Sequence, residues 1–158
     1  MVTTYAPIGE TPLLREVVGH DHLSVISAVT PQGALSLRVD EASITGERVV
    51  RFLRQLVRRW PGRKFLLFWD SATIHRGEAV KEFLASTPPG QFQIELLPGY
   101  APDLNPDEGV WNHLKEHELA NVSCMDREEL RGELAAATQR LQRRPELIRS
   151  FFQEAGLR

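Results

Sequence analysis

The stretch "LLPGYAPDLNPDEGVW" (residues 96–111) combines a stiff backbone with two adjacent carboxylates. Three prolines and a glycine restrict the chain before Asp107 and Glu108. Asn105, Pro106 and Glu108 form an Asn-x-x-Glu capping box with proline at the first helical position, which predicts a helix beginning at Pro106. Capping alone does not require such a stiff loop. Since the restricted backbone fixes where the helix begins, we expect it to hold Glu108 at a defined point over a sheet.

Upstream of this loop, hydrophobic periodicity predicts four strands. The segment "KFLLFWD" (64–70) is almost continuously apolar and ends in an acid, which is typical of a strand buried on both faces in the middle of a sheet. Residues 92–97 predict a further strand. Residues 22–30 and 33–41 predict two strands joined by a hairpin turn at Pro31-Gln32-Gly33.

Helical periodicity appears between and after these strands. Apolar residues at a spacing of 3.6 predict an amphipathic helix from Gly46 that Pro61-Gly62 ends. Further helices are predicted at 76–86, from about Pro106 to Ala120, after a capping box at Asp126, and from Pro145 to near Phe152. This order predicts an α/β fold with a mixed sheet flanked by helices.

Length and composition favour a single domain over residues 1–158, with an irregular lead-in at 1–20 and C-terminal helices within 121–158. The net charge of −2 gives no overall basic signal, so binding to nucleic acid would need a local patch. Cys124 is the only cysteine, which excludes an internal disulfide and a multi-cysteine zinc site. No apolar run approaches the roughly 20 residues of a membrane span. We therefore expect a cytoplasmic protein without a membrane partner.

Asp70 and Glu108 are the candidate catalytic and metal-binding residues. Asp70 follows the apolar strand, at the end where functional groups gather in α/β sheets. Its ordinary role would be a turn or cap, but its charge is costly beside "FLLFW" without a cation or donors. Two carboxylates from different elements repel unless a cation lies between them, and oxygen ligands favour Mg²⁺ or Mn²⁺. Such a site supports phosphoryl transfer, although a pair of acids is by itself a common pattern.

Other residues have both a functional and an ordinary interpretation. His75 could position a phosphate or a metal-bound water, or be a hydrogen-bonded loop residue. Lys115 could contact DNA phosphate or pair with an acid. The stripe of Arg51, Arg54 and Arg58 could bind DNA phosphates, or form the solvated face of an amphipathic helix. For each of these residues the sequence leaves both the functional and the ordinary interpretation open.

The combined pattern is more specific than its parts. "FLLFWDSATIHRGEAVKEFL" (65–84) followed by "IELLPGYAPDLNPDEGVWNHLK" (94–115) resembles the mariner-like DDE transposases, in particular their bacterial insertion-sequence branch. In that family the second catalytic Asp lies in D-N-A-x-x-H and the third acid in L-P-x-Y-x-P-x-L-N-P-x-E-x-x-W-x-x-L-K. Every fixed position of the second pattern is met. Residues 4–16 and 143–158 are also similar to family segments.

This resemblance implies an RNase H-like fold and DNA cleavage and strand transfer that depend on Mg²⁺ or Mn²⁺. It also implies metal-binding roles for Asp70 and Glu108, with DNA, both transposon ends and target, as the partner. Ser71 departs from the Asn that the family usually has. The family's first catalytic Asp and its central strand precede the segment similar to residues 4–16, so we expect this chain to lack both.

Three hypotheses follow. The first is a transposase catalytic domain with little activity alone, either a gene remnant or a product completed by frameshifting or by a partner chain. The second is a non-catalytic module that binds DNA, a second copy or full-length transposase and acts as an inhibitor. The third is a small nuclease that recruits another acid as third ligand. The family's first catalytic Asp has no counterpart that we can identify among Asp21, Asp40 and Glu41.

Overall fold

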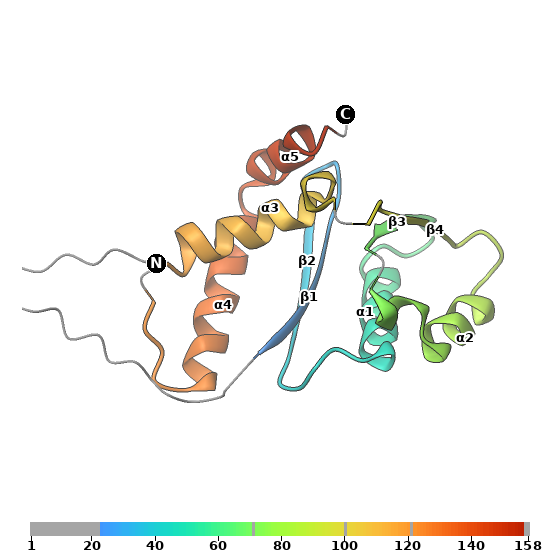
Figure 1. Ribbon diagram of the computed structural model, residues 1–158, viewed down its shortest axis with the longest axis horizontal. Coiled ribbons are helices and arrows are strands. Elements are labelled where there is room, and N and C mark those ends of the chain that lie inside the picture. Colours follow the sequence, from blue (N-terminus) through green and yellow to red (C-terminus); the bar gives the residue numbers. More distant parts are fainter. Residues whose placement is uncertain (1–22, 71, 100, 121, 157–158) are drawn as a thin grey trace, which may run out of the picture.

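The computed structural model describes residues 23–156 except 71, 100 and 121. Its elements form a mixed α/β arrangement with helices packed around two small sheets (Figure 1). The predicted lead-in at 1–20, together with Asp21, Ser71 and Tyr100, lies outside the described residues. In chain order the elements are β1 (Ser24–Val29), β2 (Leu35–Asp40), α1 (Gly46–Arg59), β3 (Phe65–Trp69), η1 (Thr73–Arg76), α2 (Glu78–Ser86), β4 (Phe92–Leu96), η2 (Pro102–Leu104), α3 (Pro106–His113), η3 (Leu114–Glu118), α4 (Arg127–Gln142) and α5 (Pro145–Glu154).

The predicted hairpin is confirmed. β1 and β2 pair antiparallel, in a register that runs from Ser24 opposite Asp40 to Val29 opposite Leu35. The turn requires Gly33, whose φ of 87° lies in the left-handed region that side chains disfavour. A Cβ on Gly33 would also overlap the backbone of Pro145 at the start of α5. One residue therefore permits both the tight turn and the close approach of the last helix.

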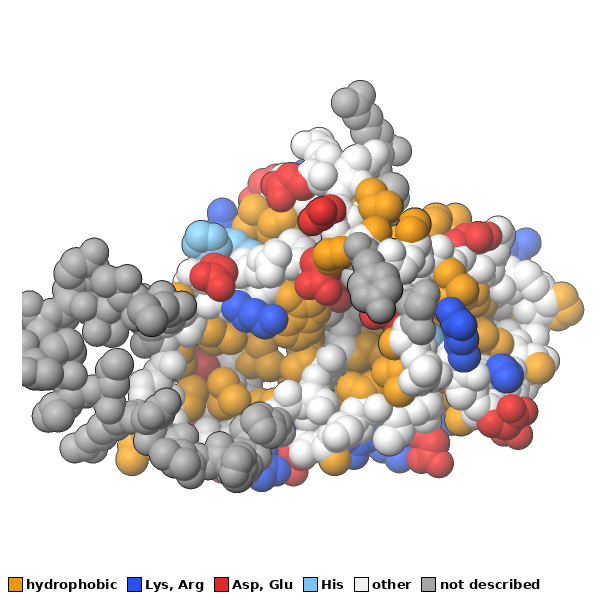
Figure 2. Space-filling view, in the orientation of Figure 1, with side chains coloured by type: hydrophobic (Ala, Val, Ile, Leu, Met, Phe, Trp, Pro, Cys, Tyr) orange, Lys and Arg blue, Asp and Glu red, His pale blue; other side chains and the backbone are white. Residues whose placement is uncertain are grey.

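The prediction that residues 64–70 form a central strand buried on both faces is wrong. Within the described residues β3 pairs only with β4, in parallel. Leu66 and Phe68, on one face of β3, are 54% and 55% exposed. The reason is that α1 and α2 cover the opposite face only. Figure 2 shows hydrophobic side chains reaching the surface over the region of this sheet.

Helix α1 connects the two sheets. Its apolar stripe is buried as predicted and ends before Pro61-Gly62. Ile26 and Ala28 of β1 pack against this stripe, and so do the α1-facing residues of β3. Both sheets therefore pack against α1. Strands β1 and β3 each have one edge that pairs with no described strand.

A second core lies on the other face of the hairpin. Val25 and Val29 of β1 contribute to it, because alternate residues of a strand point to opposite faces. Its fully buried side chains come from β2, from η3 and from the helices α3 to α5: Leu35, Val110, Leu114, Ala137, Leu141 and Ile148. Strand β1 thus has a helical layer on each face.

The predicted helices are present, with one difference. The helix that begins at Pro106 changes to π-helical geometry over Leu114–Glu118. None of the helices in the described ranges has the length and apolarity needed to cross a membrane.

An ion-pair cluster joins the π-helical turn to α4. Glu118 Oε2 accepts a hydrogen bond from Arg140 Nε at 2.6 Å, and Glu118 Oε1 lies 3.6 Å from His113 Nε2. The hydrogen bond from Arg140 holds the pKa of Glu118 below its ordinary value of 4.5. A lowered folded-state pKa means that this contribution to stability is present above the unfolded-state pKa and is lost as pH falls through the folded-state pKa.

Arg140→Gln should therefore lower the free energy of unfolding by about 0.5–1 kcal/mol at pH 7, where Glu118 is charged. The difference from the unmodified chain should shrink as pH falls through the lowered pKa of Glu118 and this carboxylate becomes protonated. Urea denaturation at pH 7 and in acid measures it. Arg143→Gln is the control, because Arg143 is exposed and makes no ion pair within the described residues. An equal loss at both pH values would contradict the electrostatic origin.

Candidate active site

Asp70 lies at the carboxyl end of β3 with its side chain 62% exposed. Its Oδ1 accepts a hydrogen bond from the backbone N–H of Ala72 at 3.0 Å. The ordinary turn role that the sequence allowed is therefore present. Yet Oδ2 has no hydrogen-bond partner among the described residues, so the carboxylate shapes its own turn and still presents one free oxygen.

His75 contacts Asp70, which fits its ordinary interpretation as a hydrogen-bonded loop residue. Its ring stacks on Trp69, with centroids 4.6 Å apart and planes 13° apart. Its Nε2 lies 3.2 Å from Asp70 Oδ1. Burial lowers the pKa of His75 below 6.5, against the opposing effect of Asp70. A neutral ring that donates through Nε2–H fits this geometry and leaves Nδ1, which is buried without a partner, unprotonated.

Glu108 lies in the first turn of α3 without the capping role that its spacing indicated. Asn105 does cap the helix, because its Oδ1 accepts from the backbone N–H of Asp107 at 3.1 Å. The reciprocal half of the predicted box is missing. The exposed Glu108 carboxylate makes no hydrogen bond or ion pair with any residue that the structure describes.

The predicted box at α4 provides a direct comparison, because its acid does reach back to the backbone, at the residue just before the N-cap. Asp126 Oδ1 accepts from the backbone N–H of Glu129 at 2.8 Å, and Glu129 Oε2 accepts from that of Met125 at 2.7 Å. Glu129 therefore does what Glu108 does not. The two acids have the same spacing from their caps, but only Glu108 leaves its carboxylate free for another ligand.

Asp107, next to Glu108, is the site residue that sequence reasoning missed. Its Oδ2 accepts from Ser27 Oγ at 2.7 Å and from Trp111 Nε1 at 3.2 Å. Its Oδ1 is buried without a partner, and burial raises the pKa of Asp107 above 3.8. The spacing of Asp107 and Trp111, four residues apart on a helix, could have suggested one of these bonds. Trp111 packs against the second core.

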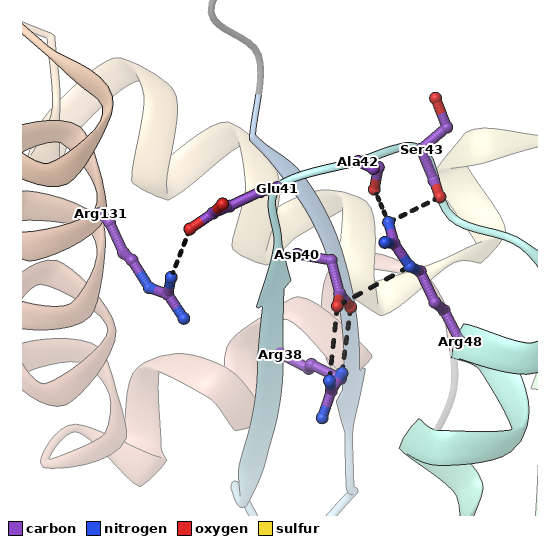
Figure 3. Close-up of polar contacts among 7 residues, drawn as sticks. All are labelled: Arg38, Asp40, Glu41, Ala42, Ser43, Arg48 and Arg131. Atoms are coloured by element: carbon purple, nitrogen blue, oxygen red, sulfur yellow. Dashed lines mark hydrogen bonds and ion pairs between the residues drawn. The ribbon is translucent and has the colours of Figure 1, made fainter.

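The two described acids considered as replacements for a third ligand are already paired. Figure 3 shows Asp40 between Arg38, at 3.0 Å, and Arg48, at 3.9 Å. It also shows Glu41 paired with Arg131 at 3.0 Å. These contacts link the end of β2 to α1 and α4, so both carboxylates already have cationic partners.

The donor chemistry of Asp70 and Glu108 fits a hard divalent cation, because each presents free carboxylate oxygen at the surface. They share no hydrogen-bond partner in the described part of the chain. There, no three His, Cys, Asp or Glu side chains lie close enough together to hold a metal ion. The described residues thus present two candidate ligands, and no group of three that could hold a metal ion.

The arginine stripe lines a groove between α1 and α2. Arg51 and Arg54 border a hollow of about 490 Å³, and Arg54 and Arg58 border an adjoining one of about 290 Å³. Phe83 lines both hollows, and Arg54 Cζ lies 5.5 Å from the centroid of its ring. Two acids, Glu47 and Glu82, also line the larger hollow.

Lys115 is not part of this groove. It is exposed on η3 and makes no ion pair within the described ranges. The structure therefore brings the three arginines of the stripe together and places Lys115 on another element.

Comparisons with known proteins agree with this architecture. A family model described as DDE superfamily endonuclease matches residues 2–131. Among solved structures, "Mos1 transposase paired-end complex with left transposon end" is similar, with a TM-score of 0.58 and 17% identity over 98% of this chain. At this identity the likeness shows the fold alone, and this chain spans 51% of that one. No curated protein matches the sequence.

The contrast between Glu108 and Glu129 can be tested by stability. Glu129→Ala should lower the free energy of unfolding by about 0.5–1 kcal/mol more than Glu108→Ala, because only Glu129 accepts a capping hydrogen bond. Both variants replace a Glu by Ala in the first turn of a helix. The effects of helix propensity and of the lost negative charge on the free energy of unfolding are therefore similar and largely cancel in the difference. Chemical denaturation at pH 7 measures the difference. Equal losses would show that Glu108 also caps its helix.

Proposed function

Because the chain belongs to the DDE superfamily endonucleases, we propose that it is a transposase catalytic domain of the bacterial insertion-sequence branch. Its activity would be metal-dependent DNA cleavage and strand transfer in the cytoplasm. The observation that carries the proposal is the state of Glu108. This carboxylate lies in a helix turn whose other residues are held by contacts, yet it makes no hydrogen bond or ion pair with any described residue.

In this proposal Asp70 and Glu108 hold the cation, Mg²⁺ or Mn²⁺. Once bound, the cation would supply an activated water or 3′-hydroxyl and stabilise the leaving oxygen. Asp70 would bind through the oxygen that its turn leaves free. The N–H of His75 holds the other oxygen and so orients the carboxylate.

We propose DNA as the partner, both transposon ends and target, with the α1–α2 groove as one phosphate-binding surface. Arg51, Arg54 and Arg58 are exposed along it, and guanidinium groups suit phosphate oxygens. Lys115 would add a contact from η3. The Mos1 structure contains a transposon end, which supports DNA as the ligand class.

Arg54→Gln should weaken binding to a DNA duplex and reduce the slope of log affinity against log salt by about one. Arg54 is the choice because it borders both hollows. Fluorescence anisotropy from 50 to 200 mM salt measures this slope. Arg149→Gln on α5 is the control, since within the described residues Arg149 donates a hydrogen bond to the carbonyl of Gln32 and makes no ion pair. A slope equal to that of the unmodified chain would identify the groove as an ordinary solvated face.

We further propose that the described part of the chain is not a complete active enzyme. Two observations support this. No cluster of three ligating side chains occurs among the described residues, and β1 and β3 each have an unpaired edge there. The first catalytic Asp and a central strand, supplied by frameshifting or by a partner chain such as full-length transposase, would meet both needs.

An assay of nicking of transposon-end DNA in Mg²⁺ and in Mn²⁺ tests the proposal. We expect little or no cleavage by this chain alone, because two carboxylates hold the metal more weakly than three. Robust cleavage that Asp70→Asn and Glu108→Gln abolish would support an intact small nuclease instead. Cleavage indifferent to both substitutions would contradict the roles assigned to these two acids.

The second candidate is a non-catalytic module that binds DNA or transposase. The missing third ligand among the described residues favours it. Binding to transposon-end DNA that is unchanged in Asp70→Asn and Glu108→Gln, and unaffected by chelation of metal, would select this candidate. Binding strengthened by Mn²⁺ through those two residues would select the catalytic one.

A further inference from the structure

Asp107 and Glu108 are neighbours in sequence with opposite environments. Over residues 106–110, Glu108 is the only exposed residue. Consecutive residues of an α-helix project about 100° apart around its axis. A contact that fixes the direction of Asp107 therefore fixes the direction in which Glu108 projects.

The contacts of Asp107 provide such a constraint. Ser27 belongs to β1, 80 residues away in sequence, and its hydroxyl donates to Asp107 Oδ2 at 2.7 Å. Trp111, one turn further along the same helix, donates to the same oxygen at 3.2 Å. The first bond ties the helix start to the strand between the two cores, and the second restricts the side-chain conformation of Asp107.

The residues around Glu108 hold the turn from other sides as well. Pro106 is buried at the first helical position. A Cβ on Gly109 would lie 2.8 Å from Cγ of Phe151, so α5 packs directly on the backbone there. Contacts that do not involve Glu108 thus fix both the rotation of this turn about the helix axis and its position along that axis.

Asp107 is not placed to be a ligand itself. Its Oδ2 is occupied by two donors, and its Oδ1 is buried away from solvent. Stability does not account for a carboxylate here either, because burying its charge is costly and an apolar side chain of similar size avoids that cost. What the carboxylate adds is a directional link between β1 and α3.

We propose that Asp107 is a positioning residue that aims the Glu108 carboxylate at a divalent cation, through the hydrogen bonds from Ser27 and Trp111. This inference rests on the proposed metal-binding role of Glu108. It assigns a function to a residue outside the fixed positions of the Asn-Pro-x-Glu motif.

The test measures Mn²⁺ binding to the full chain by NMR, since Mn²⁺ broadens the amide signals near it even when binding is weak. Glu108→Gln should remove the broadening at residues 108–110. Asp107→Ala and Ser27→Ala should each weaken Mn²⁺ affinity about tenfold, as loss of a group that orients a ligand does. Asp107→Asn should restore most of the affinity, because its amide oxygen can accept both hydrogen bonds.

The outcomes separate the two proposals. If Glu108→Gln leaves Mn²⁺ broadening unchanged, the metal role of Glu108 fails and this inference falls with it. If Glu108→Gln removes broadening but Asp107→Ala and Ser27→Ala bind Mn²⁺ as the unmodified chain does, only the positioning role is overturned. NMR reports on folded molecules, so a variant that is merely less stable keeps its affinity. Ser27→Ala provides the answer if Asp107→Ala does not fold.

Discussion

The packing of β1 between two helical layers is the constraint on which the rest of the structure depends. Ile26 and Ala28 face α1, and through α1 they are linked to the β3–β4 sheet that carries Asp70. Val25, Ser27 and Val29 face the layer of α3 and its neighbours. Each candidate metal ligand is therefore connected to the same strand, one through a shared helix and the other through the Ser27–Asp107 hydrogen bond.

Local sequence signals predicted the elements well, because their causes are local. The hairpin follows from two alternating segments around Gly33, and α1 from a helical stripe ended by Pro61-Gly62. The burial of β3 could not be predicted in this way. An apolar run looks the same whether one or two layers cover it, and here Leu66 and Phe68 face no covering layer among the described elements.

The candidate site likewise contains short-range features that the sequence indicated and long-range ones that it could not indicate. His75 was identified five residues from Asp70, and the arginine stripe by its helical spacing, because both are short-range patterns. The capping motif predicted identical roles for Glu108 and Glu129, although only Glu129 reaches back to the backbone. Spacing defines a capping box, but the side-chain conformation decides whether it closes. The Ser27–Asp107 contact spans 80 residues and has no local signature.

The exposed apolar residues of β3 have a consequence for the behaviour of the protein in concentrated solution. Leu66 and Phe68 leave about half of their surfaces in water, beside a strand edge that has no described partner. Uncovered apolar area next to an open edge favours adhesion between molecules. The net charge of −2 provides little repulsion against it. Self-association through Leu66 and Phe68 would therefore be opposed by added surface charge beside them.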